Sequence, residues 1–349
     1  MDIKKLENFL QENNLPKFRL GQIQKAIFTD GAFSFSEITT LSKELREKME
    51  SQLRLLSFET EKVLVAKDGQ SIKALLKLHD GDLIETVLIA PKPGIWSACI
   101  SCQVGCAMGC RFCATGKMGF KRDLTAEEIT DQVLFWRQYL KLKAKSEKLK
   151  AEEVSTIVYM GMGEPFNNWD NVSESIKNLT DEKLFGFGSR SISVSTSGIA
   201  SGIERMANEF PQINLAISLH FASDKKRDLY MPVNKKDNLE SLKNALKGYF
   251  TITNRKVFLE YIMLDGINDT ALDAKMLADF IYSIGSTHLL HMNLIRYNMT
   301  SDPPAGGLQP SSKTRTQIFK QELEKHQVHA TIRKSLGEEI KAACGQLAS

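Results

Sequence analysis

Residues 99–113 read Cys99-Ile-Ser-Cys102-Gln-Val-Gly-Cys106-Ala-Met-Gly-Cys110-Arg-Phe-Cys113, and they hold five of the six cysteines of the chain. The sixth, Cys344, comes close to the end of the sequence. Disulfide-stabilised secreted domains distribute their cysteines through a short chain, whereas this chain has 349 residues and one dense cluster. We therefore expect a metal or redox site in this segment.

Two kinds of metal site are compatible with the cluster. The pattern Cys106-x3-Cys110-x2-Cys113 supplies three thiolates from one loop, which would hold a 4Fe–4S cluster and leave one iron free to bind a substrate. Cys99-x2-Cys102 and Cys110-x2-Cys113 also form CxxC pairs, as in a zinc ribbon. However, the two pairs are closer together than in a ribbon, and Cys106 is left over. The spacing favours iron and sulfur over zinc.

From the first cysteine onward, short apolar segments alternate with amphipathic ones, which predicts six β-strands that are each followed by an α-helix. The periodicity fits either an open doubly wound sheet or an incomplete barrel. In both folds ligands collect at the carboxyl ends of the strands. The predicted strands are 98–101, 155–160, 191–195, 213–219, 257–263 and 288–295. The predicted helices begin near Ala126, Trp169, Ile199, Leu239, Ala271 and Lys313.

Two further segments precede this α/β region. Residues 1–56 have apolar side chains at helical spacing, which predicts a small helical module. Residues 57–95 contain three strand candidates separated by Asp-Gly dipeptides, which are typical of hairpin turns. These candidates are 62–65, 74–78 and 83–89, and the dipeptides are Asp68-Gly69 and Asp80-Gly81.

The composition is that of an ordinary globular protein, with 42% hydrophobic and 25% charged residues. No apolar run is long enough to cross a bilayer, and residues 1–7 lack an apolar secretion segment, so we expect a cytoplasmic protein without a membrane partner. The net charge of +4 permits an RNA partner without requiring one. The densest basic segment, 141–150, is interpreted either as a solvated helix end or as a phosphate contact.

Read with its surroundings, the cysteine cluster resembles a family signature. Cys106-x3-Cys110-x2-Cys113 is similar to the signature of the radical S-adenosylmethionine (SAM) superfamily. The longer segment from Cys99, ending in Cys113-Ala-Thr-Gly-Lys-Met-Gly-Phe120, resembles the RlmN/Cfr family of radical SAM RNA adenine methyltransferases. The blocks that agree with this family, in its order, are Ile84-Glu85-Thr86-Val87-Leu88-Ile89, Met160-Gly-Met-Gly-Glu164-Pro165, Ser195-Thr-Ser-Gly198, Ser218-Leu219-His220, Asn293-Leu-Ile-Arg-Tyr-Asn298 and Ala343-Cys344-Gly-Gln-Leu347.

The resemblance implies an α/β fold, a partial (βα)6 radical SAM barrel with a small helical N-terminal domain. The implied division is 1–56 for a helical RNA-binding domain, 57–95 for a β-hairpin extension, 96–335 for the barrel and 336–349 for a tail with a methylated cysteine. It also implies that three cysteines bind a 4Fe–4S cluster whose fourth iron chelates SAM. These cluster ligands are Cys106, Cys110 and Cys113, and the matching SAM contacts are Gly163, Glu164, Ser195, Ser218, Leu219, His220 and Asn298.

A radical mechanism that uses two SAM molecules per turnover is implied as well, because adenine ring carbons are poor nucleophiles. One SAM methylates the sulfur of Cys344. A second yields a 5′-deoxyadenosyl radical that takes a hydrogen atom from this methyl group, and the resulting carbon radical adds to adenine. Cys99 would then attack the Cys344 sulfur, forming a disulfide and freeing the base. Either Glu85 or Cys99 would accept the proton.

Cys102 stands where the family usually has serine. It is interpreted as a small substitution near the cluster, and the alternatives are an off-pathway ligand or a competing disulfide partner.

The family has two branches, and the sequence contains features of both. One branch methylates carbon 2 of an adenosine in the peptidyl-transferase centre of 23S rRNA, and in some members a tRNA adenosine. The other methylates carbon 8 of the same rRNA adenosine and confers antibiotic resistance. Gln103-Val104-Gly105 and Gly163-Glu164-Pro165 resemble the first branch, whereas Arg296-Tyr297-Asn298 and 24–28 are nearer the second. We expect carbon 2, with 23S rRNA as partner, tRNA as a further one, and an electron donor such as a flavodoxin-type reductase system.

Two hypotheses from other classes stay open at the level of sequence. The chain could be a zinc-stabilised RNA-binding protein without catalysis, which stoichiometric zinc without iron would support. It could also be a radical SAM enzyme that acts on a substrate other than RNA.

Overall fold

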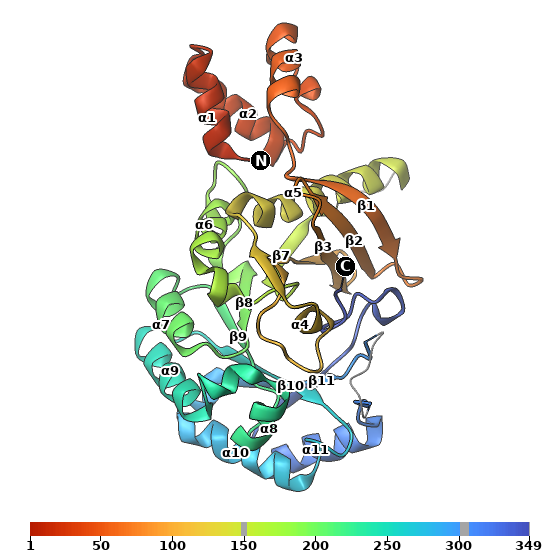
Figure 1. Ribbon diagram of the computed structural model, residues 1–349, viewed down its shortest axis with the longest axis vertical. Coiled ribbons are helices and arrows are strands. Elements are labelled where there is room, and N and C mark those ends of the chain that lie inside the picture. Colours follow the sequence, from red (N-terminus) through yellow and green to blue (C-terminus); the bar gives the residue numbers. More distant parts are fainter. Residues whose placement is uncertain (148–151, 301–306, 349) are drawn as a thin grey trace.

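A ten-stranded sheet forms the centre of the protein in the computed structural model, which describes residues 1–147, 152–300 and 307–348 (Figure 1). Its strand order is β1-β2-β3-β4-β7-β8-β9-β10-β11-β12. The bounds are β1 Phe58–Val65, β2 Ser71–Leu78, β3 Leu83–Lys92, β4 Ile95–Cys99, β7 Val154–Tyr159, β8 Ile192–Thr196, β9 Asn214–Ser218, β10 Val257–Met263, β11 Leu290–Arg296 and β12 Ala330–Arg333.

The order of the strands decides between the two folds that the periodicity allows. From β4 to β12 all neighbouring strands are parallel, and they follow one another in chain order without a reversal. A doubly wound sheet reverses its order at a switch point. Because crossovers are right-handed, an unreversed order places the helices on one face, as in a barrel. The predicted partial barrel is confirmed, and β12 is an additional parallel strand that the sequence did not predict.

The six predicted helices are all present and cover the outer face of the sheet (Figure 1). Local signals fix their ends, because Asn238 caps the helix that begins at Leu239, and Thr270 forms a capping box with Asp273. The unpredicted helices α4 Ala114–Met118 and α8 Asp224–Tyr230 are too short to show helical periodicity. The predicted helices are α5 Ala126–Glu147, α6 Trp169–Thr180, α7 Ala200–Glu209, α9 Leu239–Ile252, α10 Ala271–Ile284 and α11 Lys313–Lys325.

The helical N-terminal module lies at one end of the molecule, beyond α5 (Figure 1). It contains α1 Ile3–Glu12, α2 Phe18–Gln24, a π-helical turn Lys25–Thr29 and α3 Lys43–Gln52. Side chains of α5 donate hydrogen bonds to its backbone. Arg137 binds the Phe28 carbonyl at 3.2 Å, and Gln138 binds the Ala32 carbonyl at 2.7 Å. The module is therefore docked on the first helix of the barrel.

The predicted hairpins continue the barrel sheet without a break. Strand β2 is antiparallel to both β1 and β3, and β3 is antiparallel to β4. Both turns use the predicted glycines, since Gly69 has φ +66° and Gly81 has φ +90°. The barrel sheet therefore begins with three antiparallel strands, of which β3 lies directly beside β4.

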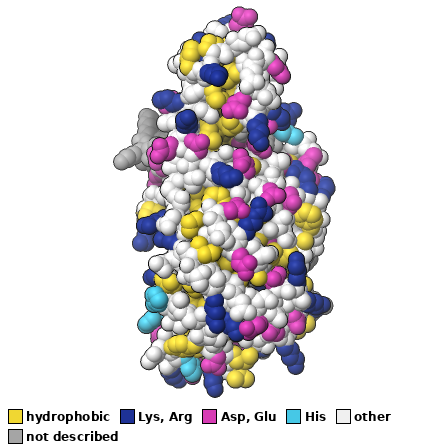
Figure 2. All heavy atoms as spheres, turned by 90° about the vertical axis from the view of Figure 1, so that its left-hand side faces the viewer, with side chains coloured by type: hydrophobic (Ala, Val, Ile, Leu, Met, Phe, Trp, Pro, Cys, Tyr) yellow, Lys and Arg dark blue, Asp and Glu magenta, His cyan; other side chains and the backbone are white. Residues whose placement is uncertain are grey.

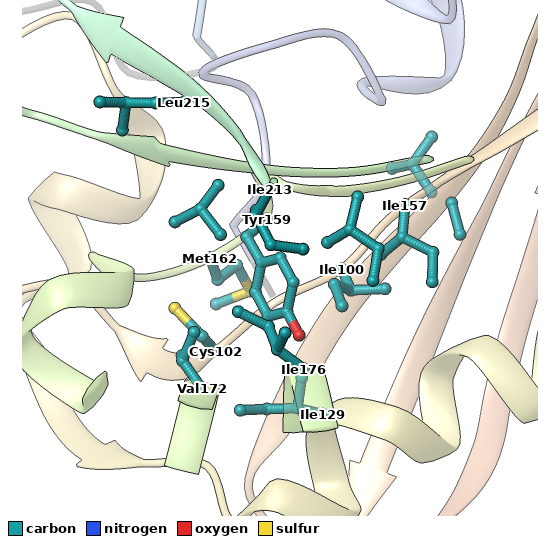
Figure 3. Packing of buried hydrophobic residues seen from close by; sticks show 14 of the residues in the cluster. Ile100, Cys102, Ile129, Ile157, Tyr159, Met162, Val172, Ile176, Ile213 and Leu215 are labelled. Atoms are coloured by element: carbon teal, nitrogen blue, oxygen red, sulfur yellow. The ribbon is translucent and has the colours of Figure 1, made fainter. Parts of the chain in front are cut away.

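The hydrophobic core lies between the sheet and the outer helices. Figure 3 shows Tyr159, Met162 and Ile176 packed together with Cys102. Cys102 is buried in this core and forms no disulfide, which fits its interpretation as a small substitution. Within the described residues, no helix is long and apolar enough to cross a membrane.

The basic segment 141–150 lies only partly within the described residues, because Lys148 and Lys150 fall outside them. Lys141 donates to the Gly31 carbonyl at 3.2 Å, and the ammonium of Lys143 lies 5.6 Å from the Trp96 ring centroid. These two lysines contact the protein itself, which favours the structural interpretation of this part of the segment.

Candidate active site

The three predicted cluster ligands lie in the loop between β5 Gln103–Gly105 and α4. This loop begins at Gly105, which has φ +73°, and a Cβ there would lie 1.9 Å from the Gly119 carbonyl oxygen. Backbone bonds fix both ends of the loop, from Cys106 to the Gly119 carbonyl at 2.8 Å and from Cys113 to the Cys110 carbonyl at 3.1 Å. The close approach that glycine permits therefore sets the path of the ligand loop.

The charges of the cluster cysteines act on one another. Burial raises the pKa of Cys106 to about 12, and burial followed by the charges of Cys113 and Cys106 raises the pKa of Cys110 well above its usual value. Ionising Cys106 and Cys110 is therefore costly unless a cationic group neutralises them.

The chemistry of the donor set fits an iron–sulfur cluster, because one loop supplies three thiol side chains and thiolates are the ligands that such clusters require. Within the parts of the chain that the structure describes, no group of three or more His, Cys, Asp or Glu side chains is arranged around one metal-ion position. In a 4Fe–4S cluster each thiolate binds a different iron, so the three sulfurs can stand further apart.

The predicted SAM contacts lie at or just beyond the carboxyl ends of successive strands. Gly163 and Glu164 follow β7, Ser195 is in β8, and residues 218–220 end β9. Asn298 follows β11. Because parallel strands end at one edge of a sheet, these residues share the side of the barrel expected to bind ligand.

Glu164 is buried, and its carboxylate orders the turns around it. Its two oxygens accept hydrogen bonds from the backbone N–H of Phe166 at 3.2 Å and of Ser197 at 2.7 Å. Burial raises the pKa of this carboxyl group. Gly163 has φ +106°, and a Cβ there would lie 2.7 Å from the side chain of Gln103. Gly163 and Glu164 therefore form a close-packed turn that places a buried carboxylate beside the strand ends.

His220 contacts the cluster loop directly. Its ring packs edge-on against Phe112, which lies between two cluster ligands, at 4.9 Å between centroids. Its Nδ1 accepts from the Ile262 N–H at 3.1 Å. Burial, with the charge of Arg227, lowers the pKa of His220 to about 3. The imidazole is thus neutral at physiological pH, with its proton on Nε2.

Asn298 has an unused acceptor inside the protein. Its Nδ2 donates to the Cys344 carbonyl at 3.2 Å, whereas its buried Oδ1 has no hydrogen-bond partner among the described atoms. A buried acceptor left unpaired costs about 1–3 kcal/mol. This residue therefore fits a bound ligand that offers a donor, as the amino groups of SAM do.

Arg227 ties the strand ends together and was not found by sequence reasoning. It is fully buried, its Nη2 donates to the Ser197 carbonyl at 3.0 Å, and its Nη1 donates to the Leu219 carbonyl. The guanidinium thus links the ends of β8 and β9. It lies in α8, and its partners are carbonyls in other parts of the chain, so no sequence motif indicates it.

The C-terminal tail is folded onto the cluster loop. The Ala114 N–H donates to the Gly345 carbonyl at 2.8 Å, and the Thr115 hydroxyl donates to the Leu347 carbonyl at 2.6 Å. Cys344 is exposed to solvent, although the protein atoms around it raise the pKa of its thiol. The tail thus brings Cys344 from the far end of the sequence to the ligand loop.

Cys99 and Cys344 are electrostatic neighbours. Burial, followed by the nearby Cys344, raises the pKa of the Cys99 thiol to about 12. The charge on one sulfur thus acts on the other, and thiol exchange between Cys99 and Cys344 stays a prediction.

A cation that the sequence did not indicate lies beside these two sulfurs. Arg333 in β12 forms an ion pair with the buried Glu260 of β10 at 3.3 Å, and Glu260 also accepts from Asn293 at 2.9 Å. The charge of Arg333 counteracts the raised pKa of both Cys99 and Cys344. It therefore favours the thiolate form at the position where thiol exchange would occur.

Glu85 in β3 contacts both a lysine and the tail. Its Oε1 accepts from Lys73 Nζ at 2.9 Å, and its Oε2 accepts from the Ala348 N–H at 2.9 Å. Lys73 was also missed, because one lysine in an apolar strand pattern has no signature of its own. Thus the predicted proton acceptor is buried against the segment that contains Cys344.

A hollow of about 500 Å³ lies elsewhere, between the outer helices α6 and α7. Its lining is largely charged and includes Asp170, Arg205 and Glu209. It belongs to the helical layer and not to the strand ends, so it is not the candidate site. On the face shown in Figure 2, basic and acidic side chains are interspersed.

Comparisons with known proteins identify the family of the chain. Residues 1–55 match the ribosomal RNA large subunit methyltransferase N-terminal domain, and residues 100–277 match the radical SAM superfamily. The chain is 39% identical to the ribosomal RNA large subunit methyltransferase Cfr of Lachnoclostridium phytofermentans, with 98% of this chain and 96% of the relative covered. It is 41% identical to the probable dual-specificity RNA methyltransferase RlmN of Streptococcus suis, covering 99% and 90%.

A solved structure has the same fold. The crystal structure of a radical SAM methyltransferase from Sphaerobacter thermophilus is 37% identical, with a TM-score of 0.90 and coverage of 99% of this chain and 97% of the other. Enzymes of this superfamily use a 4Fe–4S cluster and SAM, for which the cysteine loop and strand ends supply fitting residues. The fold, the cysteine loop and these matches place the chain in the RlmN/Cfr family of radical SAM RNA methyltransferases.

Proposed function

We propose that this enzyme methylates carbon 2 of an adenosine in the peptidyl-transferase centre of 23S rRNA, with a tRNA adenosine as a second substrate. The observation that carries the proposal is the position of Cys344, which is exposed and whose neighbour Gly345 is hydrogen-bonded to the end of the loop of the three cluster cysteines. A methyl-carrying sulfur needs access to solvent-borne RNA on one side and to a bound cofactor on the other. Relatives named as rRNA and dual-specificity RNA methyltransferases support RNA as the substrate class.

The chain's own residues have distinct parts in this proposal. When bound, the cluster and SAM supply the methyl group and the radical that activates it. Cys106, Cys110 and Cys113 hold the cluster, and the residues at the strand ends hold SAM. Cys344 carries the methyl group, and Cys99 frees the product by thiol exchange. Glu85 or Cys99 accepts the proton from the base.

The partner that supplies electrons is also part of the proposal. A flavodoxin-type reductase system would provide them from outside the chain, because none of the side chains described here is an electron source of that kind.

Carbon-8 methylation is the second candidate. The relative named Cfr is as similar in sequence as the relative named RlmN, at 39% and 41% identity. Arg296-Tyr297-Asn298 also resembles the carbon-8 branch. Overall identity therefore does not separate the two products.

Anaerobic turnover with SAM that bears a deuterated methyl group tests both candidates. The reaction contains reconstituted enzyme, a reductant and either an rRNA fragment from the peptidyl-transferase centre or a tRNA, and the nucleosides are separated and identified by mass spectrometry. Labelled 2-methyladenosine supports the proposal, whereas labelled 8-methyladenosine assigns the second candidate. SAM cleavage without methylated adenosine indicates a substrate other than RNA, and zinc without iron indicates a binding protein.

Replacing the methyl-carrying sulfur gives a direct prediction. Cys344→Ala is expected to abolish adenosine methylation while the enzyme keeps its cluster and still cleaves SAM, because the three cluster ligands are unchanged. The measurement is methyladenosine formed per enzyme, with iron content as the control. Retained turnover in this variant would show that the methyl group reaches RNA by another path.

A further inference from the structure

A buried ion pair joins the second and third strands of the sheet. Lys73 in β2 and Glu85 in β3 are both buried, and their Nζ and Oε1 atoms are 2.9 Å apart. Removing two charges from water is costly, and their attraction repays this cost only when the remaining polar atoms are also bonded. The other hydrogen-bond partners of Lys73 and Glu85 therefore indicate which segment the ion pair holds in place.

Further partners of this pair come from the C-terminal tail. Lys73 Nζ donates to the carbonyl of Lys341 at 3.1 Å, and Glu85 Oε2 accepts from the N–H of Ala348 at 2.9 Å. Cys344 lies between these two contacts in the sequence. One ion pair thus binds both ends of the segment 341–348 that contains the reactive sulfur.

The backbone of the tail is shaped for this contact. Lys341 has φ +52°, in the left-handed region that residues other than glycine rarely adopt. Two residues before Lys73 on the same strand, Ser71 lies so close to the tail that a Cβ on Gly337 would stand 3.0 Å from its Cβ. Strand β2 therefore contacts the tail at two positions on one face.

We propose that Lys73 is a positioning residue for methyl transfer, which sets the Glu85 carboxylate relative to the Cys344 sulfur by binding both Glu85 and the tail. This inference rests on the proposed function, in which Cys344 carries the methyl group. Lys73 touches neither the predicted cluster ligands nor the predicted SAM contacts in the bonds described above. Its loss is expected to slow the chemical step and leave RNA binding unchanged.

Three variants test the inference in the full-length, cluster-loaded enzyme. Lys73→Met is expected to lower kcat by about 10- to 100-fold with KM for RNA nearly unchanged, because a displaced reacting group affects the transition state more than binding. Lys73→Arg keeps a charged donor and is expected to restore most of the kcat. Lys77→Met is the matched control, since Lys77 lies on the same strand but pairs with the exposed Glu61 at 3.6 Å. It is expected to behave as the wild type.

Hydrogen exchange of the tail gives a readout that is independent of turnover. Lys73→Met is expected to speed amide exchange in peptides covering 338–348, whereas Lys77→Met leaves it unchanged. If Lys73→Met does not fold, Lys73→Leu replaces it with the same expectations, because leucine also lacks both the donor and the charge.

The outcomes separate this inference from the proposed function. A wild-type enzyme that forms no methyladenosine contradicts the proposed function, whatever Lys73 does. With an active wild type, an unchanged kcat and unchanged tail exchange in Lys73→Met overturn the positioning role. A raised KM at constant kcat overturns it as well, because Lys73 would then bind RNA. Failure of Lys73→Arg to recover any activity lost by Lys73→Met also counts against a role for the positive charge.

Discussion

The sulfur of Cys99 determines how the candidate site responds to pH at the scale of single residues. Burial, and after it Cys344, raises the pKa of the Cys99 thiol to about 12. Only the thiolate is nucleophilic, and an ordinary cysteine thiol has a pKa of 9.0. We predict that alkylation of Cys99 by iodoacetamide, followed by peptide mass spectrometry, accelerates steadily to about pH 10. A plateau near the pKa of an ordinary thiol would contradict the raised value.

The raised pKa of Cys99 also determines the direction in which the free energy of unfolding changes with pH. The folded state holds the Cys99 proton more tightly than the unfolded state, whose thiol ionises near its ordinary value of 9.0. The contribution is therefore fully present below that value and is lost as pH rises towards about 12. Urea unfolding should show a fall in the free energy of unfolding through this alkaline range, and Cys99→Ala should make the fall smaller.

Arg333 gives a third prediction at this scale. Its guanidinium lowers the pKa of both Cys99 and Cys344 against the effect of burial. Arg333→Met is therefore expected to slow the alkylation of Cys99 at neutral pH by roughly 3- to 10-fold. Arg190→Met is the control, since Arg190 is bonded to Gln212 on the surface. Equal rates in the wild type and Arg333→Met would mean that the charge does not act on the sulfur.

Among the structural elements, the turn after β7 depends on a glycine. Gly163 has φ +106°, and a Cβ there would lie 2.7 Å from Gln103 and 2.9 Å from the sulfur of Cys102. Gly163→Ala is expected to lower the free energy of unfolding by about 2–4 kcal/mol, from backbone strain and overpacking together. Urea denaturation measures this change. Gly188→Ala is the control, because Gly188 has φ −64° and a Cβ there would have no atom within 4 Å. An equal fall in the free energy of unfolding of both variants would contradict the argument from strain and overpacking.

Length alone does not separate the elements that the sequence predicted from those that it missed, since β8 and β9 have five residues each and were predicted. In β12 the large apolar residue is Ile332, which is exposed, so this strand shows no buried apolar run. α8 has seven residues, which is too few to show a helical period. Because β12 was not predicted, its residue Arg333 was not recognised as part of the candidate site.

The candidate site follows the same division. The cysteine loop and the residues at the strand ends stand in contiguous motifs, so the sequence indicated them. Arg227, Glu260 and Lys73 act on carbonyls or side chains far away in the chain. Their importance depends on which strands become neighbours, and a single sequence contains no local signal for that.

For the whole molecule, Arg137 is the residue that joins separate parts. Its guanidinium donates to the Phe28 carbonyl at 3.2 Å and to the Phe185 carbonyl at 2.7 Å, and it lies 4.6 Å from the Phe187 ring centroid. It thus links the N-terminal module, α5 and the segment before β8.

Loss of this link should loosen the N-terminal module and leave the barrel intact. Arg137→Met is expected to speed hydrogen exchange of residues 1–55 by about 10-fold, which corresponds to the loss of one or two buried hydrogen bonds. Exchange in β8 to β10 should stay as in the wild type. Lys145→Met, on the same helix, is the control, and uniform acceleration across the chain would indicate global destabilisation instead.

The closing of the C-terminal tail onto β3 has a consequence for the order in which the protein folds. Glu85 and Ala348 are 263 residues apart in the sequence, yet they are hydrogen-bonded. Contacts between residues so far apart in the sequence form late in folding. The entropy of the intervening chain must be lost before such a contact can stabilise the fold. Cys99 and Cys344 are separated in the sequence by the parallel strands that follow β4, so we expect the two sulfurs to be held in their native positions only once the sheet between them has paired.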